Sequence, residues 1–579
     1  MTRFACLPTL LMVIGLSAPT LDAAPTSFTH FKDAFIEAYW RQNPESAVVA
    51  GYYKHADRLP IPDAADRHRS LAFAATWLNK LKAYDRTALN AQDRIDLDMI
   101  RTELEAGRWF TTGFKGHQWD PSTYNVAGTF GLLLGTDYAP LETRLRTVAK
   151  RLPHVGPYYA AAWANLKHPT LEHTQLAILQ NKGALGVFGD SFKQQVETSK
   201  LSAAEKVSLH AGAAKARAAI QGYITRLEGL EKQLKVSGGR SFRIGKANFE
   251  ASFRYTIQAD GTAEDMYRRA LSEKEKLHVR MAALATELWP KYFGTEPRPT
   301  DRLELIGRMV ERLSQNHVTA DGFVAEVKRQ IPLLEAWVRE HDLVSMDPTK
   351  PLVVRDTPEY MRGVAGASVS APGPYDPKAN TYYNVTPLEG TPAEKESYLR
   401  EYNEYILQVL NIHEAVPGHY VQLLHANQSP SLVKAIFGNG AMVEGWAVYS
   451  ERMMLESGYG GPSPEMWLMY SKWNLRVVCN AILDYGIHVL GLSEDQAMRL
   501  LTQEAFQQEA EAKEKWHRAQ VTSVQLSSYF AGYSAIYDLR EQLKVQQGDR
   551  FNLKRFHEQF LSYGSAPVRS IRELMLPKR

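Results

Sequence analysis

Two histidines and a glutamate in the stretch Asn411–Tyr420 carry the side chains of a hydrolytic metal site. The imidazole nitrogens of His413 and His419 are good zinc ligands, and Glu414 follows the first histidine directly. In metalloproteases a glutamate at that position takes a proton from water. We therefore interpret this stretch as part of a candidate zinc site that the rest of the chain must position.

The spacing of the two histidines does not fit a continuous helix. One helical turn separates the histidines in the usual His-Glu-x-x-His pattern. Here His419 follows His413 by six residues, which turns it by about 120° on an ideal helix. Pro417 lacks the amide that would bond the carbonyl of His413, and Gly418 adds backbone freedom. We predict that the helix bulges or opens there and brings the nearest ring nitrogens within about 4 Å, whereas a separation above roughly 6 Å would exclude joint ligation.

A third ligand is predicted at Glu444, which lies among apolar residues in a later helical stretch. A carboxylate in such surroundings needs a partner, and a metal ion is one. Glu451, seven residues on, falls on the same helix face and could orient a ligating histidine. Three protein ligands and an open position are typical of catalytic zinc, so we expect one Zn²⁺ per chain, with Glu414 as general base.

Two further side chains are candidate donors to the oxyanion of a tetrahedral intermediate. His488 follows Asp484 by four residues, so the Asp484 carboxylate could orient its ring. Tyr529 lies in another helical stretch near a glycine. The alternatives are a hydrogen-bonded core histidine for His488 and a packed aromatic ring for Tyr529. Arg476 is a weaker candidate for binding a substrate carboxylate.

Hydrophobic periodicity predicts a mainly α fold. Apolar residues recur at helical spacing from Phe28 to about Leu343, with breaks rich in glycine and proline, and one helix is predicted at Ala263–Phe293. Later helices are predicted at Pro392–Leu410, Met442–Glu456, Pro464–Leu490, Glu494–Arg518, Ser523–Leu543 and Lys554–Leu561. We divide the chain into a signal peptide (1–23), a helical scaffold or cover (24–350) and a catalytic region (351–579).

Between residues 351 and 387 the pattern changes to short β-like runs, Leu352–Val354 and Thr381–Val385. Prolines around these runs favour the edges of a sheet. A small sheet whose edge strand lies just before the metal helix could bind an extended peptide through main-chain hydrogen bonds. The alternative is an ordinary connecting hairpin.

Charge and hydropathy argue against two classes of partner. The chain has 579 residues, with 68 lysines and arginines against 64 aspartates and glutamates, so its net charge is only +4. No basic run indicates a nucleic-acid surface. After the N-terminal segment no run approaches about 18 uninterrupted apolar residues, so no membrane span is predicted. The sequence carries no signal for an oligomeric state.

The N-terminus predicts export to the periplasm or the medium. Arg3 precedes the apolar run Leu7–Ala18, and Leu21-Asp22-Ala23 ends in a small residue suited to signal peptidase. A buried N-terminal helix is the alternative. The chain has two cysteines, and the first leaves with the signal. The remaining one, Cys479, lies in an apolar helical pattern and is predicted to be buried.

Three motifs together resemble the bacterial DUF885 family. They are His413-Glu414-x-x-Pro417-Gly418-His419, Glu444-Gly445-Trp446-Ala447-x-Tyr449-x-Glu451 and Asp484-x-Gly486-x-His488. The resemblance covers most of the mature chain and is sharpest from Tyr382 to Pro567. It also takes in Tyr382-Tyr383-Asn384, Gln525-x-x-x-Tyr529-x-x-Gly532 and Gly564-x-x-Pro567. Tyr382, Tyr383 and Asn384, on the predicted edge strand, are candidate substrate-binding residues.

That family is grouped with zincin-like metallopeptidases of the gluzincin type. The resemblance therefore implies a mostly helical fold with a small sheet beside the active-site helix. It also implies the ligands His413, His419 and Glu444 and the base Glu414. Dipeptidyl peptidase III enzymes are similar in having a lengthened motif, with one extra residue where this chain has two.

These observations predict an exported zinc metallopeptidase that hydrolyses short or unfolded peptides. A helical N-terminal half packed over a deep site would exclude folded substrates. One alternative is a zinc hydrolase of another amide or ester. Another is a non-catalytic binding protein with a degenerate metal site, which the lengthened motif favours.

Overall fold

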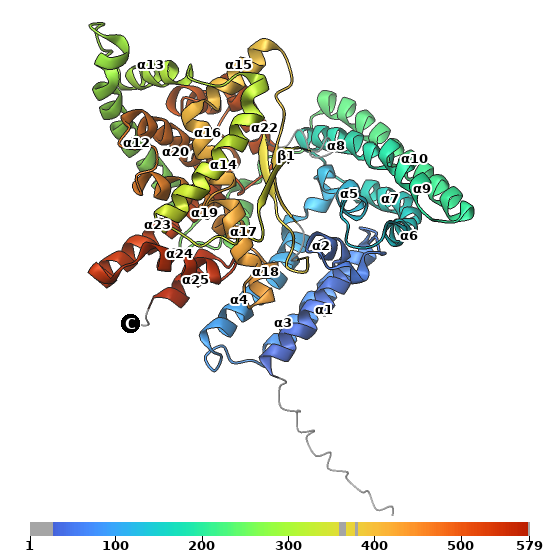
Figure 1. Cartoon of the computed structure of the whole chain (residues 1–579). Helices are drawn as coiled ribbons and strands as arrows, with labels where there is room; N and C mark the ends of the chain where they lie inside the picture. Colours follow the sequence, from blue (N-terminus) through green and yellow to red (C-terminus); the bar gives the residue numbers. More distant parts are fainter. Residues whose placement is uncertain (1–26, 358–365, 377–379, 577–579) are drawn as a thin grey trace, which may run out of the picture.

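The computed structural model describes residues 27–357, 366–376 and 380–576, and these residues are mainly helical, as predicted (Figure 1). The predicted signal peptide lies outside the described residues. Within them, no helix combines the length and the apolar character that crossing a bilayer requires. Cys479 is buried, as predicted.

The N-terminal half contains fourteen α-helices in the described ranges. They are α1 (Phe28–Gln42), α2 (Pro44–Val49), α3 (Ala64–Leu81), α4 (Ala91–Trp109), α5 (Ala127–Gly135), α6 (Leu141–Arg151), α7 (Val155–Asn165), α8 (Leu171–Ala184), α9 (Asp190–Thr198), α10 (Ala203–Ser237), α11 (Gly245–Thr256), α12 (Ala263–Phe293), α13 (Arg302–Ser314) and α14 (Phe323–Glu340). Helix α12 has the bounds that its periodicity predicts. Helices α5 to α10 form a group of their own, which Figure 1 shows in light blue, teal and green.

Three strands and eleven α-helices follow. They are β1 (Leu352–Asp356), β2 (Ala367–Ser370), β3 (Thr381–Val385), α15 (Pro392–Glu401), α16 (Glu404–Glu414), α17 (His419–Asn427), α18 (Leu432–Ile436), α19 (Gly440–Glu456), α20 (Pro464–Tyr485), α21 (Glu494–Arg499), α22 (Glu509–Val521), α23 (Ser527–Gln547), α24 (Leu553–Ser562) and α25 (Val568–Met575).

Two predicted helices are each broken in the structure. The stretch predicted as Pro392–Leu410 divides at Asn403, whose side chain accepts hydrogen bonds from the amides of Tyr405 and Ile406 and so caps α16. The stretch predicted as Glu494–Arg518 divides into α21, a π-helical turn and α22. An asparagine side chain can accept hydrogen bonds from the first amides of a helix, so a new helix begins where the earlier one could have continued. The helical periodicity of apolar residues does not reveal such a break.

The main hydrophobic core draws on both the predicted scaffold and the predicted catalytic region. It includes Phe35 of α1 and Ile306 of α13 together with Ile412 of α16 and Trp446 of α19, all fully buried. A second cluster fills the interior of the α5–α10 group and also takes in Val48 of α2. The N-terminal helices α1 and α13 therefore share one interior with the helices that carry the candidate site.

The sheet has the order β1-β3-β2, with β1 parallel and β2 antiparallel to β3. The strand just before α16 is thus the central strand, and the prediction that it forms the edge is wrong. Strand β2 forms an edge instead and lies against α16. Proline-rich flanks favour edges, but they did not indicate which strand would be paired on both sides.

Helix α19 packs against α23 at two glycines. A Cβ atom on Gly445 would collide with the backbone of Gly532, and one on Gly532 would collide with the carbonyl of Ala441. Only glycine allows the two helix backbones to approach this closely. The contact fixes the part of α23 that carries Tyr529 relative to Glu444, the residue before Gly445.

We expect Gly445→Ala to destabilise the protein by about 1–3 kcal/mol or more, because an added methyl group must push α23 away. Gly440→Ala is the matched control on the same helix, since a Cβ there meets nothing within 4 Å. Its effect should stay within about 0.5 kcal/mol. Denaturant unfolding of both variants makes the comparison, and equal stabilities would show that the close approach is not required.

Candidate metal centre

The chain opens between the two histidines. His413 and Glu414 are the last residues of α16, and His419 is the first residue of α17. The amide of Gly418 donates to the carbonyl of Ile412 at 3.0 Å, so the connecting turn folds back onto the end of α16. This confirms that the helix does not continue through Pro417, and it places His419 beside His413.

Two contacts fix the shape of this turn. A Cβ on Gly418 would collide with the carbonyls of Ile412 and His413, so only glycine fits there. The indole Nε1 of Trp446 donates to the carbonyl of Pro417 at 2.9 Å. Trp446 is fully buried and lies two residues after Glu444, so α19 and the turn are held in register.

The side chains of His413, His419 and Glu444 converge. Glu444 Oε2 lies 3.7 Å from His413 Nε2 and 3.4 Å from His419 Nε2. One ligand atom from each residue lies within 4.8 Å of the other two, below the roughly 6 Å that would exclude the histidine pair. Tetrahedral zinc with bonds of about 2.0–2.2 Å would separate its ligand atoms by about 3.3–3.6 Å. The donor chemistry therefore fits zinc, and the two distances from Glu444 to the imidazole nitrogens are close to this spacing.

Glu451 orients one of the two imidazoles. Its Oε1 lies 2.7 Å from His413 Nδ1, and its side chain is fully buried. A carboxylate acceptor fixes the proton on Nδ1 and leaves Nε2 as a lone-pair donor facing Glu444. In His419, Nε2 likewise faces Glu444, while Nδ1 is buried without a hydrogen-bond partner among the described residues.

The pocket stabilises negative charge at Glu444 and disfavours it at its neighbours. For Glu444, burial alone would raise the pKa, but the two imidazoles lower it far below the usual range. Burial alone would lower the pKa of His413, but the carboxylates of Glu444 and Glu451 raise it to about 10. Burial raises the pKa of Glu414 and of Glu451. Within the described ranges, His413, His419 and Glu444 are the one group of three or more histidine, cysteine, aspartate or glutamate side chains spaced to hold a metal ion.

The site is recessed but open. The side chain of Glu444 is 22% exposed and that of His419 is 12% exposed, so both are mostly buried and still reach solvent. Glu414 and Tyr529 are also only partly buried. A small substrate could therefore reach the three candidate ligands and the candidate base together.

The structure brings Tyr529 to the site. Its ring stacks on that of His413, with centroids 6.5 Å apart. Its hydroxyl oxygen accepts hydrogen bonds from Arg518 Nη2 at 3.2 Å and from Gln525 Nε2 at 3.4 Å. With both contacts made through its lone pairs, the phenol keeps its proton free to donate.

His488 and Asp484 do not form the pair that their spacing predicts. The Asp484 carboxylate accepts hydrogen bonds from the amides of Val524 and Ser527 and from the Ser527 hydroxyl, so it caps the start of α23. His488 Nε2 lies 3.0 and 2.8 Å from two backbone carbonyls, and burial lowers the pKa of this ring to about 4. His488 is therefore the hydrogen-bonded core histidine of the alternative interpretation.

The candidate substrate-binding residues also have partners within the protein. Arg476 Nη2 pairs with Glu511 Oε1 at 2.5 Å, so it is not free to bind a carboxylate. Tyr383 is fully buried and donates to Asn411 Oδ1 at 2.8 Å, which anchors β3 to α16. Asn384 is buried too, and its side chain bonds to Arg355 and Ser370. These three corrections share one cause, since each polar group was paired inside the fold by a residue distant in sequence.

Tyr382 lies on the opposite face of β3 from Tyr383, because successive strand residues alternate in direction. The Arg355 guanidinium lies 3.7 Å from the centre of its ring. Tyr382 is partly exposed, and it stays a candidate for substrate contact.

Sequence reasoning missed Arg518 and assigned no role to Gln525. Both lie next to Tyr529 in space, and Gln525 lies in the turn before α23, four residues before Tyr529. Arg518 and Lys515 occupy one face of α22 together with Glu511, a spacing that could have drawn attention to that face.

Comparisons with known proteins agree with the fold. A family model described as "Bacterial protein of unknown function (DUF885)" matches residues 44–575. Over 95% of its length the chain is 52% identical to all of a solved protein from Shewanella oneidensis, a candidate lipoprotein of unknown function, with a TM-score of 0.86. It is 17% identical to a candidate lipoprotein from Colwellia psychrerythraea, covering 95% of this chain and 98% of that one, with a TM-score of 0.77, which shows a shared fold. No curated protein matches the sequence. The chain belongs to the DUF885 family.

Proposed function

We propose that this protein is an exported zinc peptidase that hydrolyses peptide bonds in short or unfolded chains. The observation that carries the proposal is the convergence of His413, His419 and Glu444, with Glu451 holding the first histidine. Three ligands, an open position and an oriented imidazole are the parts of a catalytic zinc site.

Each group near this donor set has a role in amide hydrolysis. A zinc ion held by His413, His419 and Glu444 would lower the pKa of a water molecule and polarise the carbonyl to be cleaved. Glu414 accepts the proton of the attacking water and later gives it to the leaving amine. Its pKa is raised by burial, which makes it a stronger base than an exposed glutamate. Tyr529, held by Arg518 and Gln525, donates a hydrogen bond to the developing oxyanion.

Strand β2 supports a peptide as the substrate. It is an edge strand beside α16, and all four of its residues are partly exposed. The main-chain groups along such an edge can pair with an extended peptide, as in other peptide-binding sheets. Esters and small amides would gain nothing from this strand, and therefore we favour a peptidase.

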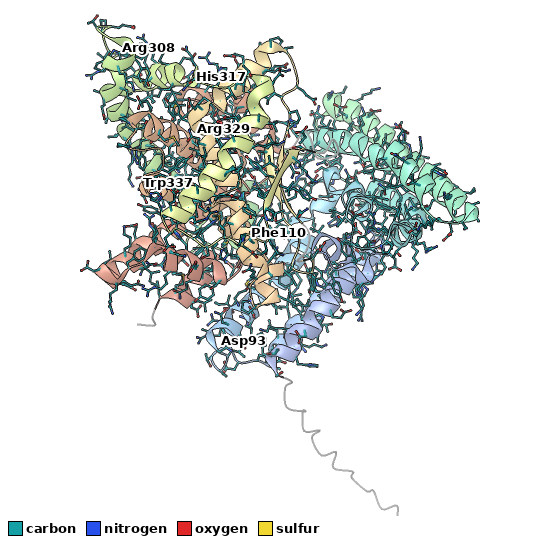
Figure 2. All side chains as sticks on the ribbon, viewed as in Figure 1. Asp93, Phe110, Arg308, His317, Arg329 and Trp337 are labelled. Carbon is teal, nitrogen blue, oxygen red and sulfur yellow. The ribbon has the colours of Figure 1, made fainter. Side chains whose placement is uncertain are left out.

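The surrounding helices limit the size of the substrate. Helix α14 packs against α16, and Gln330 of α14 accepts a hydrogen bond from Asn411 at 2.7 Å. Arg329 and Trp337 mark the length of this helix in Figure 2. Helix α22 contacts α8 of the N-terminal group. Walls built from both halves of the chain would admit an extended strand more readily than a folded protein.

Export is part of the proposal. The solved protein from Shewanella oneidensis is described as a candidate lipoprotein, a class that crosses the inner membrane. The N-terminal pattern of this chain has the basic start, apolar run and small residue of a secretory signal.

Metal analysis tests the ligand set. After zinc loading and dialysis we expect about one zinc per chain for the natural protein, because a three-ligand site binds one ion. His419→Ala and Glu444→Ala should each retain less than about a tenth of that amount, since a ligand is lost. His425→Ala is the control on the same helix, because its ring bonds to the carbonyl of Ser345 instead. Full zinc content in the two ligand variants would rule out this donor set.

Glu451→Gln separates orientation from charge. The amide oxygen can still accept from His413 Nδ1, but the negative charge that strengthens Nε2 as a ligand is gone. We expect zinc affinity to fall about 10- to 100-fold, measured by competition with a chelator. Glu456→Gln, on the same helix and paired with Arg452 and Arg540, should leave the affinity unchanged. Equal affinities for both variants would remove Glu451 from the metal centre.

Glu414→Gln tests the chemistry. We expect it to keep its zinc and to lose about 10²- to 10⁴-fold in kcat on a peptide library read by mass spectrometry. Glu404→Gln, at the other end of α16, should retain the natural rate. Unchanged turnover in Glu414→Gln would exclude this mechanism. Absence of any cleavage by the zinc-loaded natural protein would favour a binding protein.

A further inference from the structure

Helix α22 carries a face of charged residues toward the protein interior. Glu511, Lys515 and Arg518 follow each other at four- and three-residue intervals, so they line one side of the helix. Lys515 is only 4% exposed and Arg518 is partly buried. Buried lysine is rare unless it is paired, so the counterions of these two cations are informative.

Neighbouring carboxylates are already engaged by other cations. Lys472 pairs with Glu401 at 2.8 Å, both side chains being 3% exposed, and Arg476 takes Glu511 at 2.5 Å. Lys515 Nζ is left 3.9 Å from Glu511, beyond hydrogen-bond distance.

Arg518 has neutral partners only. Its Nη2 donates to Gln525 Oε1 and to Tyr529 Oη. In the described part of the chain no carboxylate lies within 4 Å of its guanidinium, and the exposed Glu514 is beyond that range of both Arg518 and Lys515. Among the described residues Glu511, which already pairs with Arg476, is thus the one carboxylate within 4 Å of either cation, whereas Glu514 acts on Lys515 and Asp484 on Arg518 from farther away. A bound anion would supply the direct counterion that both cations lack.

This cationic site adjoins the candidate metal centre. Arg518 touches the hydroxyl of Tyr529, and the Tyr529 ring stacks on His413. One side chain therefore separates the guanidinium from a candidate zinc ligand. An anion bound by Arg518 would therefore lie next to Tyr529.

Strand β2 also leads toward the same site. Gly366, directly before β2, lies so close to Tyr398 that a Cβ would collide with the phenol oxygen. Tyr398 belongs to α15, and the charge of Glu511 on α22 acts on it. A peptide that pairs antiparallel with β2 runs from Ser370 toward Gly366, so its C-terminal end approaches α22. Antiparallel pairing is the more stable and more frequent arrangement.

We propose that Arg518 and Lys515 bind the free C-terminal carboxylate of the substrate, so that the enzyme removes residues from the C-terminal end of peptides. This inference rests on the proposed function and specifies its substrate class. The guanidinium fork matches a carboxylate in two parallel hydrogen bonds, and the ammonium adds a point charge. Arg518 and Lys515 thus take the role that the sequence suggested for Arg476. The guanidinium of Arg476 is already occupied by its ion pair with Glu511.

Lys515 adds a dependence on pH. Burial and the charges of Arg476 and Arg518 together lower the pKa of Lys515 to about 7, against the opposing effect of Glu511 and Glu514. A bound carboxylate would raise this pKa, so binding takes up a proton near neutrality. The contribution of Lys515 to carboxylate binding is therefore complete below pH 7. It is lost as the pH rises through the higher pKa that Lys515 has in the complex.

The test uses zinc-loaded Glu414→Gln protein and one peptide in three forms: free acid, C-terminal amide and N-acetylated free acid. We expect amidation to weaken binding at least about 30-fold, because it leaves the buried Lys515 and the partly buried Arg518 without this counterion, and N-acetylation to change it less than about 3-fold. Lys515→Met and Arg518→Met should each reduce the acid-to-amide ratio about 10-fold. Lys513→Met is the matched control, since Lys513 lies on the exposed face and pairs with Glu509.

Equal binding of acid and amide by protein with intact Arg518 and Lys515 would overturn the carboxylate site without any need for a further variant. A ratio that persists in both methionine variants would also overturn it. Turnover by the natural zinc-loaded enzyme separates the two proposals. Cleavage of acid and amide at equal rates removes the carboxylate site and leaves the peptidase. A retained acid preference in binding without any turnover removes the peptidase and supports the carboxylate site.

Discussion

The break in the backbone between Glu414 and His419 is the constraint on which the rest of the site depends. A continuous helix would turn His419 about 120° away from His413. Ending α16 at Glu414 and starting α17 at His419 returns the second ring to the first. The break is stable only because Gly418 fits against two carbonyls and Trp446 bonds to Pro417. Two separate parts of the chain, residues 412–418 and Trp446, therefore specify one turn of four residues.

Hydrogen bonds and ion pairs from several other elements hold the helices on either side of this turn in place. Tyr383 of β3 and Gln330 of α14 both bond to Asn411, two residues before His413. Lys434 of α18 pairs with Asp96 of α4, and each is 1% exposed. The buried Glu451 would be costly without a partner, and the imidazole of His413 supplies one. The N-terminal half is thus a structural support for the site as well as a wall around it.

Much of the site could be predicted because its signals are local. The order of His413, Glu414 and His419 fixes the donor chemistry, and the seven-residue interval from Glu444 to Glu451 puts both carboxylates on one helix face. Pro417 and Gly418 indicated that the helix must open. The mainly helical fold followed from periodicity, and α12 matches its predicted bounds. These features could be predicted because each is determined by residues that lie close together in the sequence.

The errors arose where distant residues competed for the same group. The interval from Asp484 to His488 permits a contact, but the amides at the start of α23 hold the carboxylate instead. Arg476 faces Glu511, which is 35 residues away in sequence. Strand β2 is four residues long, too short for alternation to identify, and its place at the edge depends on pairing with β3. Spacing shows which groups can meet, whereas the fold decides which pair forms.

The most direct measurement is anomalous diffraction at the zinc absorption edge from crystals of the zinc-loaded protein. The account predicts one peak per chain, about 2 Å from Nε2 of His413, Nε2 of His419 and a carboxylate oxygen of Glu444. A peak elsewhere, or well-ordered side chains at these positions with no peak between them, would contradict it.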